Sequence, residues 1–131
     1  MEEKRKNKRI PITLDIQIIL STGEKYKGKT INLSFGGVMA RFQENVAIKP
    51  ESLCKMILLL EAGEEYIELN FKAKAVHIKE NILGFSFLYI IDLDGYKHFK
   101  NLMVFNSDDP DELLNELEEH PGMLIDKGNK L

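Results

Sequence analysis

Two short segments of this 131-residue chain carry side chains that together suit the binding of a nucleotide. The first is basic and holds Arg5 and Arg9, four residues apart. The second supplies an amide, a hydroxyl and two glycines, namely Asn32, Ser34, Gly36 and Gly37. A guanidinium group forms paired hydrogen bonds with a phosphate or with the O6 and N7 edge of guanine. The two segments therefore contain the donors and acceptors needed to hold a guanine base and a phosphate at once.

The second segment complements the arginines. Guanine presents N1–H and N2–H donors on its other edge, and the Asn32 carbonyl and the Ser34 hydroxyl can accept from them. Gly36 and Gly37 lack a Cβ atom, which allows the backbone of a turn to approach a ligand closely. Each segment alone has a plain interpretation, because a basic arm is usually solvated and Asn-x-Ser-x-x-Gly is usually a turn between strands. Their order along the chain is what makes a shared site a useful hypothesis.

Composition indicates one globular domain. The chain has 44% apolar and 30% charged residues, and its net charge of −3 does not suit a general polyanion-binding protein. The charge is unevenly placed, because residues 1–9 are basic, whereas residues 107–120 are rich in Asp and Glu and contain no Lys or Arg. The two ends can contact different partners or each other.

Cys54 is the single cysteine, so no internal disulfide can form. It lies in an apolar run that resembles a strand, and we expect a buried structural thiol. The N-terminus has no apolar stretch behind its charges, and the longest apolar run, residues 56–60, is far shorter than a membrane span. We therefore expect a cytoplasmic protein that does not insert into a membrane.

Several short segments with a two-residue apolar period predict strands. Turn residues separate them, as in Ser21–Glu24 and around Gly63. In the second strand, Tyr26, Gly28, Thr30 and Asn32 are expected to share one face. Short strands joined by tight turns favour a small antiparallel barrel or sandwich. The expected strands cover residues 10–18, 25–33, 38–42, 53–60, 66–76 and 82–90.

The apolar period changes to three and four after Ile91, which predicts an amphipathic helix that starts near Asp92 or Asp94. This helix could plug one mouth of the barrel, and we assign its aromatic residues, Tyr96, Phe99 and Phe105, to the core. A second, acidic helix is predicted from Asp109, where Pro110 and Glu112 complete a start signal. We therefore divide the chain into a flexible basic arm (1–9), a barrel with its packing helix (10–106) and an acidic helical C-terminal extension (107–131).

Arg5-x-x-x-Arg9 followed by Asn32-x-Ser34-x-x-Gly37 resembles the signature of the PilZ domain family, RxxxR with [D/N]xSxxG. The resemblance continues through residues 9–12, the family's entry to its first strand, and residues 82–87, its last barrel strand. It covers roughly residues 4–105 and leaves the acidic C-terminal segment outside.

The resemblance implies a six-stranded antiparallel split β-barrel that binds the bacterial second messenger cyclic di-GMP. The ligand-binding residues it implies are Arg5, Arg9, Asn32, Ser34 and Gly37, with Gly36 as a neighbour. Many family members have Asp where this chain has Asn32. Hydrogen bonds to charged groups are the stronger ones, so Asn weakens this contact by roughly 1 kcal/mol. It also removes a carboxylate that would repel phosphate.

Nothing in the sequence suggests catalysis or a metal site. His77, His98 and His120 lack the spacing of zinc ligands, and neither a phosphate-binding loop nor a catalytic triad is present. The main hypothesis is a non-enzymatic cyclic di-GMP receptor that needs no cofactor. Ligand binding would order the mobile N-terminal arm and signal to an unidentified effector protein, in motility, exopolysaccharide or biofilm control.

Two alternatives remain at this point. A PilZ-like adaptor could dock a protein target through its acidic helix and bind no nucleotide. Nonspecific binding of DNA or RNA by the basic arm is disfavoured by the net charge and by the shortness of the arm.

Overall fold

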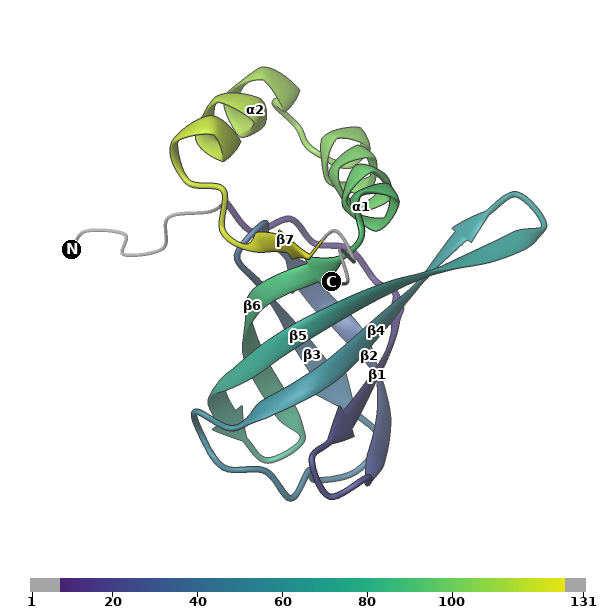
Figure 1. Ribbon diagram of the computed structural model, residues 1–131, viewed down its shortest axis with the longest axis vertical. Coiled ribbons are helices and arrows are strands. Elements are labelled where there is room, and N and C mark those ends of the chain that lie inside the picture. Colours follow the sequence, from purple (N-terminus) through teal and green to yellow (C-terminus); the bar gives the residue numbers. More distant parts are fainter. Residues whose placement is uncertain (1–7, 127–131) are drawn as a thin grey trace, which may run out of the picture.

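Alternating apolar side chains produce a mainly β-structure, which a computed structural model describes for residues 8–126. In β5, every second residue from Leu69 to Ala75 is buried, which is the expected result of a two-residue period. The six barrel strands are β1 (Asp15–Leu20), β2 (Lys25–Leu33), β3 (Gly37–Phe42), β4 (Leu53–Ala62), β5 (Glu65–Lys79) and β6 (Ile82–Ile91). The predicted six-stranded antiparallel barrel is thereby confirmed (Figure 1).

The barrel closes because β3 pairs with β2 on one side and with the first half of β6 on the other. The second half of β6 pairs instead with a short parallel strand, β7 (Leu124–Asp126). We did not predict β7, because three residues are too few for a two-residue period to be recognised. The C-terminal extension is therefore joined to the barrel by backbone hydrogen bonding.

Both predicted helices are present and begin where their capping residues indicated. Helix α1 (Leu93–Phe105) follows Asp92, whose carboxylate accepts a hydrogen bond from Gly95 N–H at 2.7 Å. Helix α2 (Pro110–Glu119) follows Asp109, whose carboxylate accepts from Glu112 N–H at 3.1 Å. Figure 1 shows α1, α2 and β7 together at one end of the barrel. Neither helix, nor any other among residues 8–126, is long and apolar enough to cross a membrane.

Helix α1 closes its end of the barrel through Phe99, whose side chain is fully buried. Its ring makes edge-to-face contacts with Phe35, Phe71 and Phe87 at centroid distances of 5.5–5.7 Å. The assignment of Phe105 to the core was wrong, because this residue is 89% exposed. It lies six positions after Phe99, and at 3.6 residues per turn that spacing places it off the buried stripe.

Two further expectations need correction around the second strand. Strand β1 starts at Asp15, and residues 10–14 lie along β2 through separate contacts. An irregularity in register between Thr30 and Asn32 interrupts the alternation of buried and exposed side chains along β2. The next buried residue after Thr30 is therefore Leu33. Asn32 therefore does not share the face of Tyr26 and Thr30. Cys54 is buried in β4, as expected.

Candidate functional site

The two sequence segments meet because the chain after Arg9 runs antiparallel to the end of β2. Ile10 N–H donates to the Leu33 carbonyl at 2.7 Å, and Leu33 N–H donates to the Ile10 carbonyl at 2.9 Å. Antiparallel pairing then advances in opposite directions along the two segments. Arg9 is thereby placed next to Ser34, and Pro11 next to Asn32. Arg5 lies outside the described residues.

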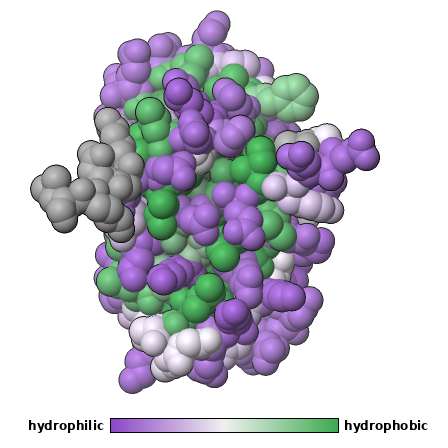
Figure 2. Space-filling model, turned by 45° about the vertical axis from the view of Figure 1, so that its right-hand side comes forward, coloured by the Kyte–Doolittle hydropathy of each residue, from purple (hydrophilic) through white to green (hydrophobic). Residues whose placement is uncertain are grey.

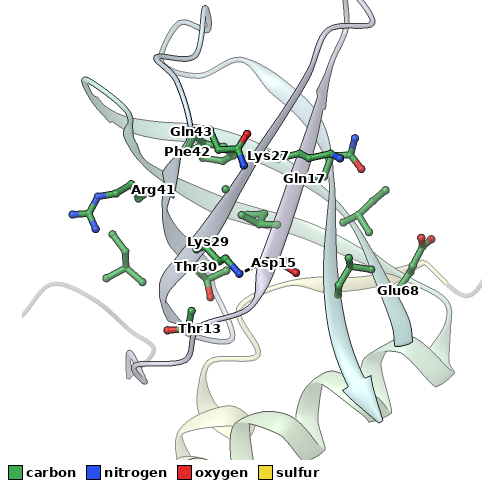
Figure 3. A pocket seen from close by; sticks show the side chains of 15 residues that line it. Thr13, Asp15, Gln17, Lys27, Lys29, Thr30, Arg41, Phe42, Gln43 and Glu68 are labelled. Atoms are coloured by element: carbon green, nitrogen blue, oxygen red, sulfur yellow. Dashed lines mark ion pairs between the residues drawn. The ribbon is translucent and has the colours of Figure 1, made fainter. Parts of the chain in front are cut away.

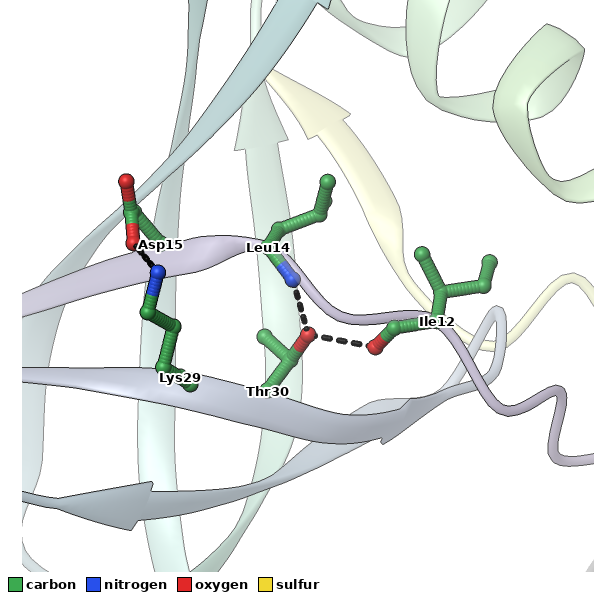
Figure 4. A network of polar contacts seen from close by, with 5 residues as sticks. All are labelled: Ile12, Leu14, Asp15, Lys29 and Thr30. Atoms are coloured by element: carbon green, nitrogen blue, oxygen red, sulfur yellow. Dashed lines mark hydrogen bonds and ion pairs between the residues drawn. The ribbon is translucent and has the colours of Figure 1, made fainter.

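A buried threonine fixes this entry segment. Thr30 is 2% exposed, and its hydroxyl accepts from Leu14 N–H at 2.8 Å and donates to the Ile12 carbonyl at 2.5 Å (Figure 4). Both bonds cross from β2 to residues 10–14, where no regular strand is formed. Sequence reasoning had placed Thr30 only on a strand face. It holds the segment that carries Arg9.

Ser34 organises the turn between β2 and β3. Its side chain is almost buried, and its Oγ accepts from Gly36 N–H at 3.1 Å and from Gly37 N–H at 3.0 Å. Ser34 N–H donates to the Gly37 carbonyl at 2.9 Å. A hydroxyl has two acceptor positions, and both are used here within the turn, so Ser34 is not available to accept from guanine as the sequence led us to expect. The hydroxyl hydrogen has only a long contact, 3.5 Å from the Gly37 carbonyl, and can donate to a ligand.

The glycines of the turn face β6. A Cβ atom on Gly37 would lie 2.2 Å from the Phe85 carbonyl oxygen, so close approach of β3 to β6 requires glycine there. The Gly36 carbonyl accepts from Phe87 N–H at 2.9 Å. Barrel closure thus gives Gly37 a structural reason of its own, and the approach of a ligand to this turn stays a prediction.

A cavity of about 200 Å³ adjoins this turn. Arg9, Ser34, Gly36 and Gly37 line one side of it, while Asn32 does not line it. The closure of β3 onto β6 adds residues that sequence reasoning missed, because strand neighbours across a barrel leave no local signal. These are Val38, Val76, His77, Gly84, Phe85 and Ser86.

A larger open hollow of about 780 Å³ lies on the outer face of β1–β5 (Figure 3). Its charged side chains have both signs, with Lys27, Lys29 and Arg41 against Asp15 and Glu68. Lys29 forms an ion pair with Asp15 at 2.6 Å, and this hydrogen-bonded carboxylate raises the pKa of Lys29. None of the signature residues within the described range 8–126 lines this hollow, and its mixed charge suits an anionic ligand less well.

Within residues 8–126, no group of three or more His, Cys, Asp or Glu side chains is arranged to hold a metal ion. What the signature cavity offers instead is a guanidinium group and a hydroxyl donor.

A family match and one solved structure agree with the fold. The sequence matches the PilZ domain family over residues 3–105. The barrel resembles the Bacillus subtilis inhibitor of motility, MotI/DgrA, with a TM-score of 0.56 and 17% identity, over 66% of this chain and 43% of that one. This chain thus spans less than half the length of that protein. A PilZ domain of CeSA from a cellulose-synthesizing bacterium aligns at a TM-score of 0.48 with 21% identity, over 61% and 79% of the two chains. No curated protein matches the chain.

Proposed function

The chain belongs to the PilZ domain family, and on that premise we propose that it is a non-enzymatic receptor for cyclic di-GMP in the bacterial cytoplasm. The observation that carries the proposal is the Ile10–Leu33 pairing, which brings Arg9 of the first segment beside Ser34 of the second. Both residues line the same cavity.

In this proposal, the Arg9 guanidinium binds either a phosphate or the O6 and N7 edge of a guanine. Arg5, assigned from the RxxxR spacing, makes the corresponding contact elsewhere on the ligand. The Ser34 hydroxyl donates a hydrogen bond to the ligand. Asn32, which does not share the inner face of β2, accepts from guanine N1–H or N2–H. Gly36 and Gly37 maintain the turn that holds Ser34.

The size of the cavity limits how much of the ligand it can enclose. Small-molecule sites usually measure about 300–1,000 Å³, whereas this cavity has about 200 Å³. We infer that it receives one guanine and that the rest of the ring lies over the surface beside the arm. We assign to His77, which lines the cavity from β5, the role of stacking on that base.

Isothermal titration calorimetry with cyclic di-GMP at low salt tests the proposal. We expect binding of micromolar order, which corresponds to about −8 kcal/mol, and weaker binding as salt rises. Arg9→Ala should abolish the signal. Arg41→Ala, which removes the same charge from the larger hollow, serves as the matched control and should leave it unchanged. No binding to the intact chain at low salt would refute the proposal.

A second candidate function, a protein-interaction adaptor, is favoured by the surface of α2. Its buried residues, Leu113 and Leu117, lie on one side, and exposed Asp111, Glu118 and Glu119 lie elsewhere on the helix. Phe105, near the end of α1, is 89% exposed. Apolar groups on the face seen in Figure 2 are interspersed with polar ones, so a partner there would need both kinds of contact.

The adaptor function can operate with or without nucleotide. In the combined form, ligand bound at Arg5 and Arg9 alters the surface beside the arm, and an effector protein recognises that surface. Replacing Asp111 and Glu118 together by Lys should then prevent association with an effector while cyclic di-GMP binding remains. Unchanged association would exclude α2 as the docking element.

A further inference from the structure

The C-terminal extension makes a direct contact with the segment that carries Arg9. Lys8 N–H donates a hydrogen bond to the Glu116 carboxylate, across 108 positions of sequence. Glu116 lies on α2, which is outside the part of the chain that matches the family. The residue bonded is the immediate neighbour of Arg9. A helix beyond the barrel is therefore attached to the binding segment one residue before its arginine.

Packing holds Glu116 in a defined place. It lies three positions after Leu113 and one before Leu117, at the edge of the buried side of α2, and is itself half-buried. After the helix, the chain passes against the signature turn, since a Cβ atom on Gly122 would lie 2.4 Å from the Phe35 carbonyl oxygen and 2.9 Å from Gly36 N. Strand β7 then joins β6. The C-terminal extension that carries Glu116 thus packs against the same turn that Arg9 adjoins.

We propose that Glu116 is a positioning residue for the cyclic di-GMP site, a role that rests on the proposed function. Its carboxylate fixes the backbone at Lys8 so that Arg9 is already held at the cavity before the ligand arrives. Binding then requires less ordering of the chain, and preorganisation of this kind raises affinity. Glu116 itself does not touch the ligand.

The competing effect is electrostatic. Glu116 is a negative charge close to a site for a phosphate ligand, and repulsion would weaken binding. Two variants distinguish the effects, because loss of positioning weakens binding whereas loss of repulsion tightens it. Glu116→Gln keeps an oxygen that can accept from Lys8 N–H but removes the charge, whereas Glu116→Ala removes both. Glu118→Ala removes a charge from an exposed position of the same helix and is the matched control.

The test combines two measurements on the full chain. Amide hydrogen exchange at Lys8 and Arg9 without ligand reports whether the segment is held. Calorimetry with cyclic di-GMP reports the consequence for binding. We expect Glu116→Ala to speed exchange at Lys8 and Arg9 and to weaken binding about tenfold, equivalent to 1.4 kcal/mol. The affinity of Glu116→Gln should stay within about threefold of that of the parent chain, since neutral hydrogen bonds retain part of the strength of charged ones. The affinity of Glu118→Ala should equal that of the parent chain.

The outcomes separate this inference from the proposed function. Unchanged exchange in Glu116→Ala, or faster exchange with unchanged affinity, would overturn the positioning role while cyclic di-GMP binding stands. Tighter binding in both Glu116 variants would also overturn it, in favour of repulsion. Absence of binding in the parent chain would overturn the proposed function and with it any role of Glu116 toward this ligand. A melting curve for each variant tests whether the domain keeps its stability.

Discussion

Replacing Phe99 by Ala tests whether α1 and the signature turn share one core. Phe99 is fully buried at the end of the barrel and touches three other aromatic rings. One of these belongs to Phe35, which lies between Ser34 and Gly36 in the turn. Loss of the Phe99 ring should therefore affect both global stability and the turn that lines the candidate site.

The expected magnitude follows from burial and ring contacts. Replacement of a buried Phe by Ala costs about 3–5 kcal/mol, through lost transfer free energy and the cavity left behind. Aromatic pairs add roughly 0.5–1.5 kcal/mol each beyond their buried area. With ring centroids 5.5–5.7 Å apart in three such pairs, Phe99→Ala should fall in the upper half of that range. The cost is a large part of the stability of a typical small domain.

Urea unfolding followed by circular dichroism measures this difference. Phe105→Ala is the matched control, because it makes the same change on the same helix at an 89% exposed position. Surface substitutions usually change stability by less than about 0.5 kcal/mol. A loss below about 2 kcal/mol for Phe99→Ala, or equal losses for the two variants, would refute the argument that α1 closes the barrel through Phe99.

Three further predictions concern single side chains. Gly37→Ala should destabilise the fold by several times the ordinary cost of a surface change, measured by thermal unfolding, because its Cβ atom would lie 2.2 Å from the Phe85 carbonyl; an unchanged melting temperature would contradict the close approach of β3 and β6. Gly122→Ala should destabilise the chain more than Gly63→Ala: both glycines have positive φ, but only Gly122 has backbone atoms in the way, and equal melting temperatures would argue against docking of the extension on the turn. Burial raises the pKa of Cys54 from 9.0 to about 11, so the stability it contributes is complete below pH 9 and is lost as pH rises toward 11. At about 1.36 kcal/mol per pKa unit, the stability lost between these pH values amounts to roughly 2–3 kcal/mol. Cys54→Ala should lack this part of the alkaline loss, and parallel pH profiles for the two proteins would contradict it.

Local sequence signals were sufficient for most of the secondary structure. The two-residue period of β5 identified its buried face, and Asp109 with Pro110 marked the start of α2. These signals work because they depend only on neighbouring residues, through alternation of side chains and satisfaction of the first N–H groups of a helix. The spacing of Arg9 and Ser34 also identified two residues that the fold brings together.

Features that depend on distant strands were not predictable in this way. No residue type in the sequence predicts the irregularity in strand register between Thr30 and Asn32. This irregularity nevertheless decides which side of β2 carries Asn32. His77 joins the cavity only because β5 and β6 pass beside the turn when the barrel closes. The bond between Lys8 and Glu116 joins the two ends of the chain, and charge alone had suggested only that these ends could meet.

The central claim is that cyclic di-GMP binds where Arg9 meets the Ser34–Gly37 turn. A titration followed by ¹⁵N-resolved NMR tests it most directly, because it locates the ligand as well as detecting it. The account predicts saturable shifts at the amides of Arg9, Ser34, Gly36 and Gly37, with the larger outer hollow unaffected. Shifts confined to that hollow, at Lys27, Arg41 and their neighbours, would contradict the site, and a spectrum unchanged by millimolar ligand would contradict the function.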